Sequence, residues 1–331
     1  MKVLYIGGTG EISFSCVLES LALGHEVTVL NRQQTQQLLP KGVRQISADL
    51  NGEGAYAGVA GESFDSVCQF FAFDAARIEA DLAAFAGRTG QYVFISSASV
   101  YEKRIDRFEW ITEQTPIHNP FWEYSQKKAR LEARLFEAHA AGQLPVTVVR
   151  PSHTYRRRLP SALGGGDWTA RRMLGGQRVI LHGDGTSLWT LTHATDFARP
   201  FARLLGNSGA LGQAFHITGE SVHSWDEIFT QMARALGVEP RLVHIASDAL
   251  IRHEPAWRGP LHGDKAPSSL FDNSKVMGVV GPFPTSVSIE VGFTAAAREV
   301  KARLEGGAGS DPALDAKVDQ ILREELHEHG A

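Results

Sequence analysis

The chain opens on a short apolar run that leads into a glycine-rich turn, Val3-Leu4-Tyr5-Ile6-Gly7-Gly8-Thr9-Gly10-Glu11-Ile12. The apolar run predicts a buried strand, and the segment from Glu11 to Leu23, which Gly24 ends, predicts the helix after it. A helix that begins directly after such a turn points unpaired backbone amides and the positive end of its dipole at the space above the turn. We therefore expect the pyrophosphate of a dinucleotide to bind there.

The individual residues of the turn agree with this expectation. Gly7 permits a tight turn, and Gly10 lets the backbone approach a phosphate without a Cβ in the way. Ser13 replaces the third glycine of the usual pattern and is still small enough for close packing of helix and strand. No Lys-Ser or Lys-Thr pair follows the glycines, which excludes a nucleoside triphosphate loop.

Further apolar runs rich in β-branched residues recur along the first half of the chain, separated by helical patterns. Such runs predict strands buried on both faces of a parallel sheet, with the segments between them crossing over as helices. The predicted fold class is α/β, a Rossmann-type doubly wound parallel sheet. The runs are Val27–Leu30, Ser66–Phe70, Tyr92–Ile95 and Val146–Val149.

The regular alternation ends near Pro151, where glycine-rich breaks begin. We expect an NAD(P)-binding Rossmann domain over residues 1–150. A smaller mixed α/β region, mainly substrate-binding and partly interleaved with the first, is expected over residues 151–305. A linker and a C-terminal helix are expected over residues 306–331. In the second region, Ser224 and Glu227 predict a capping box at the start of a helix that Gly237 ends.

Composition narrows the function classes. Of the 331 residues, 43% are apolar, which is enough to fill a core, and the formal charge of −4 gives no general attraction to nucleic acid or anionic membranes. No apolar run is long enough for a membrane span. Cys16 and Cys68 fall in expected core elements without the pairing pattern of a secreted scaffold. We therefore expect a soluble cytoplasmic protein that acts on a small molecule and does not bind a membrane, and the composition disfavours nucleic acid as a partner.

The end of the second predicted strand bears on the choice of cofactor. It reads Asn31-Arg32, where an NAD enzyme typically places an acidic residue for the ribose hydroxyls. Arg32 can instead pair with a 2′-phosphate and lie on the adenine, which favours NADP over NAD, although a plain surface arginine is the alternative. Asp49 and Leu50 follow a strand-like segment, and Asp49 is expected near the adenine amino group.

A second motif suggests proton transfer. Tyr124 and Lys128 are four residues apart, so on a helix both side chains lie on one face. The ammonium of Lys128 would then lower the pKa of the Tyr124 phenol from about 10 toward working pH. Ser97, at the end of an apolar run, would donate a hydrogen bond to the substrate oxygen. Together with the glycine turn, this predicts a Ser, Tyr and Lys catalytic set.

In these features the chain resembles the extended short-chain dehydrogenase/reductase family, in its NAD-dependent epimerase/dehydratase branch. The resemblance implies a Rossmann sheet with bound NAD or NADP, catalytic Ser97, Tyr124 and Lys128, and often a homodimer. The residues that carry it are Gly7–Ile12, Asp49-Leu50, Ile95–Tyr101, Tyr124–Lys128, Arg150-Pro151, Gly183–Thr186 and Asp196. The expected cofactor-binding set is Gly7, Gly10, Glu11, Ile12, Asn31, Arg32, Asp49, Leu50, Tyr124 and Lys128.

Two departures from the family pattern bear on the substrate. Ala98 and Ser99 stand where sugar 4,6-dehydratases carry an acid pair, which argues against dehydration. Trp189 stands near the position where members that bind nucleotide sugars commonly carry an arginine, and an aromatic face suits a sugar ring or an apolar substrate better than a diphosphate. Epimerisation of a nucleotide sugar stays open, because an arginine at another position could serve; the candidates are Arg156, Arg171 and Arg172.

A further departure is Glu11, at a position that is usually aromatic or apolar. A carboxylate there complements the helix dipole, and alternatively it faces the nicotinamide and binds a substrate hydroxyl. With Ser99, His153 and Trp189 it completes the predicted substrate contacts. The histidines show no metal-ligand spacing, so no metal is expected.

The sequence thus favours an NAD(P)-dependent oxidoreductase or epimerase that transfers hydride at a secondary alcohol or ketone carbon of a sugar-like substrate, nucleotide sugars included. One alternative is an NADPH-dependent reductase of a non-sugar ketone. The other is a relative without turnover that binds nucleotides or RNA, as some plastid members of the family do.

Overall fold

The computed structural model describes residues 1–34, 38–52, 54–104, 106 and 109–326. Within them, seven parallel strands form one sheet in the order β10-β6-β5-β4-β1-β2-β3. The order reverses beside β1, which is where such sheets bind ligands at the carboxyl ends of their strands. The strands are β1 (Lys2–Ile6), β2 (Glu26–Asn31), β3 (Arg44–Ser47), β4 (Ser66–Gln69), β5 (Tyr92–Ile95), β6 (Val146–Pro151) and β10 (Gln213–Ile217). The predicted Rossmann-type α/β fold is confirmed.

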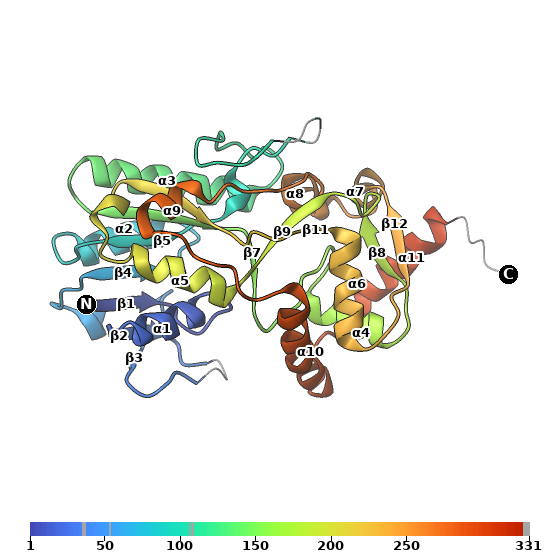
Figure 1. Cartoon of the computed structure of the whole chain (residues 1–331), viewed down its shortest axis with the longest axis horizontal. Helices are drawn as coiled ribbons and strands as arrows, with labels where there is room; N and C mark the ends of the chain where they lie inside the picture. The colour runs from blue at the N-terminus through green and yellow to red at the C-terminus, as the bar shows by residue number, and fades with distance from the viewer. Residues whose placement is uncertain (35–37, 53, 105, 107–108, 327–331) are drawn as a thin grey trace.

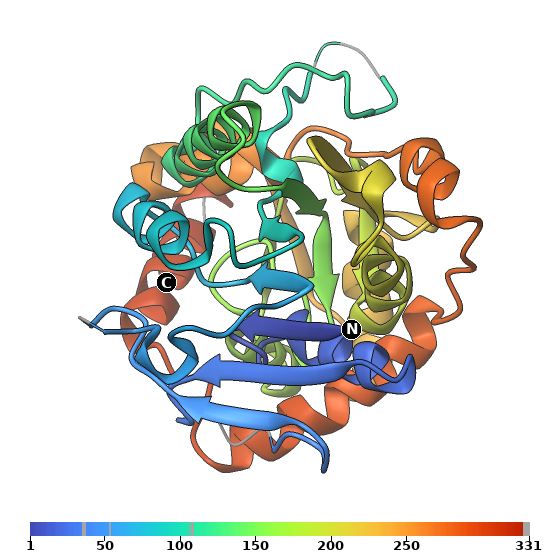
Figure 2. The same cartoon turned by 90° about the vertical axis from the view of Figure 1, so that its left-hand side faces the viewer.

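Helices cover both faces of this sheet, and successive buried side chains of β1 lie alternately on one face and the other. Val3 and Tyr5 pack against α1 (Ser13–Ala22) and α5 (Ala194–Leu204). Leu4 and Ile6 lie in the core that α2 (Ala75–Phe85) and α3 (Glu123–Ala140) close from the other side. Figure 2 looks onto this end of the molecule, with the sheet between the two helical layers. Because both faces are buried, the strands are continuous apolar runs.

The first helix differs slightly from its prediction. It begins at Ser13, two residues after the predicted start at Glu11, because Glu11 and Ile12 still belong to the turn. It ends as expected before Gly24, whose φ of +77° is in the left-handed region that glycine favours.

A second region lies beside the carboxyl ends of the sheet (Figure 1). It holds a three-stranded sheet in the order β11-β9-β7 and a two-stranded sheet of β12 and β8. The strands are β7 (His153–Tyr155), β8 (Val179–His182), β9 (Leu188–His193), β11 (Val222–Ser224) and β12 (Leu242–Ile245). The helices are α4 (Gly166–Leu174), α6 (Trp225–Leu236), α7 (Ser247–His253), α8 (Arg258–Pro260), α10 (Ile289–Glu305) and α11 (Pro312–Glu325).

The chain enters this second region at β7 and returns to the first sheet through α5 and β10, beside which α9 (Ser274–Val280) packs. The proposed domain boundaries at residues 150 and 305 stay a prediction. Short turns of 3-10 helix complete the structure, together with one π-helical turn, η5 (Leu261–Lys265). The 3-10 turns are η1 (Ala57–Val59), η2 (Ala98–Val100), η3 (Ser208–Ala210) and η4 (Pro255–Trp257).

Of the capping box predicted for α6, the Ser224 half is present, and the Glu227 carboxylate lies 2.8 Å from Nδ1 of His223 instead. The Ser224 hydroxyl accepts a hydrogen bond from the Glu227 amide at 3.1 Å, and Gly237 ends α6 with a φ of +77°. The apolar stripe of α11, with Val318, Ile321 and Leu322, is buried in the core of the second region. The C-terminal helix therefore docks on its own chain.

Two further expectations concern the whole chain. Cys16 and Cys68 are buried and form no disulfide, as their positions in core elements predict. Over the part of the chain that the structure covers, helices with the length and apolar character for crossing a bilayer are absent.

Candidate active site

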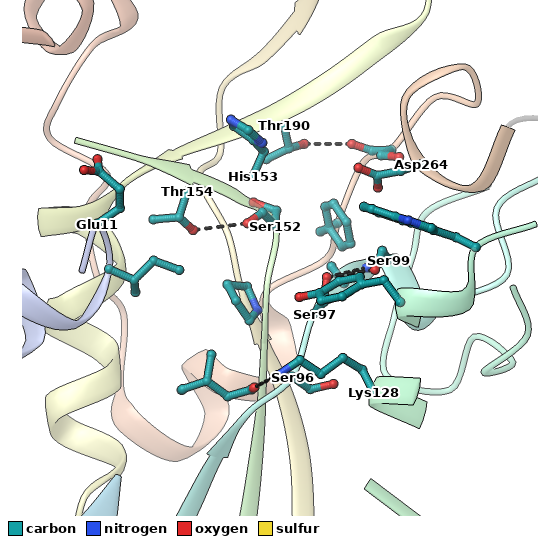
Figure 3. Close-up of a pocket in the computed structure, with 18 of the residues that line it drawn as sticks. Glu11, Ser96, Ser97, Ser99, Lys128, Ser152, His153, Thr154, Thr190 and Asp264 are labelled. Carbon is teal, nitrogen blue, oxygen red and sulfur yellow. Dashed lines mark hydrogen bonds between the residues drawn. The ribbon is translucent and has the colours of Figure 1, made fainter. Parts of the chain in front are cut away.

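A cavity of about 480 Å³ lies where the carboxyl ends of β1, β5 and β6 face the second region. Figure 3 shows its lining side chains, with Glu11 on one side and Ser97 and Ser99 on the other. The cavity brings together Gly10, Glu11, Ile12, Ser97, Ser99, Tyr124, Lys128, His153 and Trp189 from the predicted site residues. Gly7, Asn31, Arg32, Asp49 and Leu50 are predicted site residues that do not line it.

The glycine turn lies tightly against β2. Gly7 has a φ of +83°, and its amide donates to the Leu30 carbonyl at 2.9 Å. A Cβ at Gly8 would lie 2.7 Å from Cγ1 of Val29, so this position excludes any side chain. From the sequence, close packing was expected at Ser13, and the need for glycine at position 8 was not recognised. The Ser13 hydroxyl is buried and accepts from the Gly10 amide at 3.0 Å, which fixes the turn.

At the adenine end, Asn31 closes β2 with its side chain buried. Its Oδ1 accepts hydrogen bonds from the Gln33 amide and from the Gln45 side chain. Its amide nitrogen is buried and has no hydrogen-bond partner among the described residues. Buried donors are nearly always paired, so a donor left over here fits an acceptor atom of a bound nucleotide.

The other residues predicted to bind the cofactor at this end differ in their exposure. Arg32 directly follows β2 and is exposed. Asp49 is exposed as well, and its carboxylate accepts a hydrogen bond from the Asn51 amide at 3.0 Å. Leu50 is buried in the core under the sheet, so its packing accounts for its apolar character.

Glu11 connects the glycine turn to the second region. Its carboxylate accepts a hydrogen bond from the backbone amide of Arg157 at 2.8 Å. Beside it, the Arg156 guanidinium lies 4.5 Å from the ring centroid of Phe14 and donates to the Gly10 carbonyl at 3.3 Å. Glu11 therefore joins two parts of the fold at the edge of the cavity, a role that sequence reasoning did not consider.

Tyr124 lies in the first turn of α3 and presents its half-buried phenol to the cavity. Burial raises the pKa of this phenol above its usual value, and the charge of Asp264 acts in the same direction. The hydrogen bond between Tyr124 and Ser97 opposes this rise in the pKa. The phenol is therefore protonated at neutral pH.

Lys128 lies one turn further along α3, and its side chain is buried. Its ammonium donates to the carbonyl oxygens of Ala72 at 2.8 Å and Ile95 at 2.9 Å. Burial lowers the pKa of Lys128 to about 8, which the charge of Glu132 partly opposes. Burial of the phenol sets the direction of the Tyr124 pKa, and a lowering of that pKa by Lys128 stays a prediction.

A chain of three hydroxyls runs from Ser97 through Ser99 to Ser125. The hydroxyls of Ser97 and Ser99 lie 2.8 Å apart, and the Ser125 hydroxyl donates to that of Ser99 at 2.7 Å. Since Ser99 accepts from Ser125, its own proton can be donated to Ser97. The proton of Ser97 is then directed into the cavity, where the Tyr124 phenol is its hydrogen-bond partner. Ser99 thus orients Ser97, in addition to its predicted place at the cavity wall.

The wall formed by the second region is partly aromatic. The rings of His153 and Trp189 have centroids 4.9 Å apart, and Trp189 in turn lies 4.4 Å from Trp225. Burial lowers the pKa of His153 to about 4, so this side chain is neutral at neutral pH. Trp189 therefore supports His153 as well as lining the cavity.

The same wall carries an ion pair that sequence reasoning missed. The Lys103 ammonium donates to Oδ1 of Asp264, and both side chains are largely buried. Burial alone would raise the pKa of Asp264, but the ammoniums of Lys103 and Lys265 outweigh it and hold that pKa below its usual value. The two residues are 161 positions apart, and no motif marks either of them.

The other arginines considered as diphosphate anchors are engaged elsewhere. Arg171 and Arg172 of α4 both pair with Asp315 of α11, and Arg172 also reaches Asp319 at 2.6 Å. Neither of them lines the cavity. His, Cys, Asp and Glu side chains of the described residues form no group of three that could hold a metal ion.

Comparisons with known proteins agree with this geometry. The sequence model of the NAD dependent epimerase/dehydratase family matches residues 3–218. The chain is 32% identical to 2′-dehydrokanamycin reductase of Streptomyces kanamyceticus over 243 residues, which cover 72% of this chain and 67% of that one. It is 26% identical to chloroplast stem-loop binding protein of 41 kDa b of Arabidopsis thaliana, over 73% of this chain and 65% of that one.

Solved structures share the fold at low identity. UDP-glucuronic acid 4-epimerase from Bacillus cereus, in complex with NAD, matches with a TM-score of 0.72 and 16% identity, over 95% of this chain and 99% of that one. Pal from Bacillus thuringiensis matches with a TM-score of 0.72 and 20% identity, over 92% of this chain and all of that one. From the family match, the curated reductase and this shared fold, the chain belongs to the NAD-dependent epimerase/dehydratase family of extended short-chain dehydrogenases/reductases, and it is an enzyme of that family.

Proposed function

We propose that this enzyme reduces a ketone on a sugar-like ring to a secondary alcohol, with Tyr124 as the proton donor and a nicotinamide cofactor as the source of hydride. The observation that carries the proposal is the phenol of Tyr124, hydrogen-bonded with Ser97 in a cavity that the glycine turn also lines. In the reverse direction the same groups would oxidise the alcohol, and an epimerase would use both directions in turn.

The protonation of Tyr124 supports the reductive direction. Because the pKa of its phenol is raised, Tyr124 carries a proton that it can give to the substrate oxygen as that oxygen gains negative charge. Ser97 would donate a hydrogen bond to the same oxygen and polarise the carbonyl. The similarity to a protein named 2′-dehydrokanamycin reductase agrees with this direction.

The cofactor fits the residues on this side of the cavity. Gly10, which lines the cavity, has no Cβ that would keep a pyrophosphate away from the turn. The unpaired amide nitrogen of Asn31 would donate to an acceptor at the adenine end. The hydroxyl of Ser96, at the cavity wall, is likewise buried without a partner among the described residues. Arg32 would hold a 2′-phosphate, so we propose NADPH as the preferred reductant. Lys128 would stay on the cofactor side, next to β5.

The substrate we favour carries no nucleotide diphosphate. Arg171 and Arg172 pair with acidic residues of α11, and Trp189 is packed against two other rings. Of the three candidate arginines this leaves Arg156, whose guanidinium lies over Phe14. A cytoplasmic location and a homodimer stay predictions from the sequence and the family resemblance.

A second candidate function is RNA binding, which the similarity to a protein named for stem-loop binding favours. Neutralising phosphates would release counterions, so retention on an RNA column should fall steeply between 50 and 200 mM salt. A small-molecule enzyme would not be retained at either salt concentration.

The direct experiment is a turnover assay with purified protein, NADH or NADPH, and ring ketones that include 2′-dehydrokanamycin. We expect oxidation of NADPH that depends on the ketone and yields the corresponding alcohol. If neither cofactor is oxidised with any of these ketones, and the protein is retained by RNA in a salt-dependent manner, the second candidate replaces the first.

A further inference from the structure

The Lys103–Asp264 pair on the second wall of the cavity has no part in the proton transfer described above. Both side chains line the cavity and are largely buried, with 4% of Lys103 and 17% of Asp264 exposed. Burying two charges is costly unless they pair well, and apolar residues of the same size would be as stable there. A buried ion pair at a cavity wall therefore points to a use beyond stability.

The fold holds Asp264 firmly in place. It lies in the π-helical turn η5, an irregularity that occurs frequently at functional sites. The Asn119 side chain donates one hydrogen bond to the Gly263 carbonyl and another to the Ser99 carbonyl, each at 2.7 Å. Asn119 thus ties the segment of Asp264 to the segment of Ser97.

The close packing of this turn leaves little freedom. A Cβ at Gly263 would lie 3.0 Å from Cβ of Trp122, and one at Gly259 would lie 2.4 Å from Cδ1 of the same tryptophan. Trp122 directly precedes α3, the helix that carries Tyr124. Asp264 is therefore fixed relative to the phenol, and its charge is close enough to affect the pKa of Tyr124.

The pair still has hydrogen-bonding capacity to offer. Among the described residues, each of the two side chains has the other as its hydrogen-bond partner. A carboxylate has two acceptor oxygens and an ammonium has three donors, so Oδ2 of Asp264 and two protons of Lys103 are left for another molecule. An acceptor and a donor thus lie side by side at the wall of the cavity.

We propose that Lys103 and Asp264 form a subsite that binds two adjacent hydroxyl groups of the substrate ring. A hydroxyl both donates and accepts, so one hydroxyl of a vicinal diol can donate to Asp264 while its neighbour accepts from Lys103. Lys103 and Asp264 offset each other's charge, so this pair needs no charge on the ligand, while the ammonium of Lys265 also acts on Asp264. This inference rests on the proposed function and names its substrate class, a polyhydroxylated ring ketone.

The test compares two ketones that differ only in the diol. The holoenzyme is assayed with 3,4-dihydroxycyclohexanone and with cyclohexanone, and the ratio of the two kcat/KM values is measured for the wild type, Asp264→Asn and Lys103→Gln. We expect a ratio of at least about tenfold in favour of the dihydroxy ketone in the wild type, and a fall of about tenfold in each variant, mainly through KM. An unchanged ratio in both variants would overturn the proposal.

Glu79→Gln is the matched control. It makes the same change from carboxylate to amide in an ion pair, here with Arg134 at 2.7 Å on the exposed surface, and should leave the ratio unchanged. Cofactor titration and thermal unfolding of each variant separate loss of the subsite from loss of folding. If Asp264→Asn does not fold, Lys103→Gln decides the result.

A binding measurement separates this inference from the proposed function. If the wild type reduces neither ketone, ligand-observed NMR with methyl α-glucopyranoside and its 2,3-dideoxy analogue tests the subsite alone. We expect the glucoside to bind at least about tenfold more tightly than the dideoxy analogue, and Asp264→Asn to remove the difference. Equal binding of the two glycosides, or binding of neither, would contradict a diol subsite.

Discussion

The ammonium of Lys128 donates a hydrogen bond to the carbonyl oxygen of Ile95 at 2.9 Å, at the end of the strand that leads to Ser97. Lys128 therefore joins α3 to β5 and places a positive charge at the cavity, close to the segment that carries Ser97. The ammonium also lies over two aromatic rings, with the ring centroids of Phe73 and Phe94 at 4.6 and 4.8 Å. The charge thus lies in largely apolar surroundings, which lowers the pKa of Lys128.

The first prediction concerns the pH profile of reduction. The pKa of Lys128 is lowered to about 8, so its ammonium is present below pH 8 and lost above it. We expect kcat/KM for ketone reduction to fall as the pH rises through about 8. Lys128→Arg, which keeps its charge at all of these pH values, should shift the fall to higher pH. A fall at the same pH in that variant would assign the titration to another group.

The second prediction concerns the cofactor. Arg32→Ala should reduce kcat/KM for NADPH by about 10- to 100-fold, because a charge-assisted hydrogen bond to the 2′-phosphate is lost, and it should leave kcat/KM for NADH unchanged. Steady-state kinetics with both cofactors checks this. Equal losses with NADH and NADPH would show that Arg32 does not read the phosphate.

The third prediction concerns the glycine turn. Gly8→Ala would place a Cβ 2.7 Å from Cγ1 of Val29, so the turn must move and binding of the cofactor should weaken by at least about tenfold. Gly278→Ala is the matched control, since a Cβ there meets nothing within 4 Å. Fluorescence titration with NADPH compares the two. Unaltered affinity in Gly8→Ala would mean that the turn can shift without loss of the site.

The fourth prediction concerns stability. Asp81 is buried and accepts hydrogen bonds from Gln69 and Tyr92, and burial raises its pKa from 3.8 to about 6. The folded state therefore binds the Asp81 proton more tightly than the unfolded state does. Protonated Asp81 adds to the free energy of unfolding at low pH, and this contribution is lost as the pH rises through about 6. Between pH 5 and 7.5 this costs about 1 kcal/mol.

Asp81→Asn cannot titrate, so it should lack this contribution. The free energy of unfolding of wild type and variant is measured in urea at both pH values. The difference between the two proteins isolates the contribution of Asp81 from those of the other titrating groups. A difference that does not change with pH would place the pKa of Asp81 near its ordinary value.

The first sheet and the glycine turn could be predicted because their signals are local. Val3–Ile6 and Gly7 are neighbours in sequence and in space, and each apolar run becomes one strand. Tyr124 and Lys128 also share a helix, so their position on one helical face could be predicted from their spacing. The hydrogen-bond partners of Lys128 could not be predicted, because the carbonyls of Ala72 and Ile95 come from other parts of the chain.

The second wall of the cavity could not be predicted for the same reason. Lys103 and Asp264 lie far apart in the chain, and a π-helical turn leaves no periodic pattern in the sequence. Trp189 was recognised as an aromatic residue near the substrate, but its contacts with His153 and Trp225 depend on tertiary packing. Glu11 was recognised as unusual, whereas its partner, the Arg157 amide, is set by the second region.

The most direct test of the account is the single-turnover rate of hydride transfer from NADPH to a ring ketone in Tyr124→Phe. Tyr56→Phe is the control, because it removes a phenol hydroxyl outside the cavity, where Tyr56 donates to Asp81. We expect a loss of about 100-fold or more in Tyr124→Phe with cofactor affinity unchanged, and a rate close to that of the wild type in Tyr56→Phe. Transfer at the wild-type rate in Tyr124→Phe would contradict the assignment of Tyr124 as the proton donor.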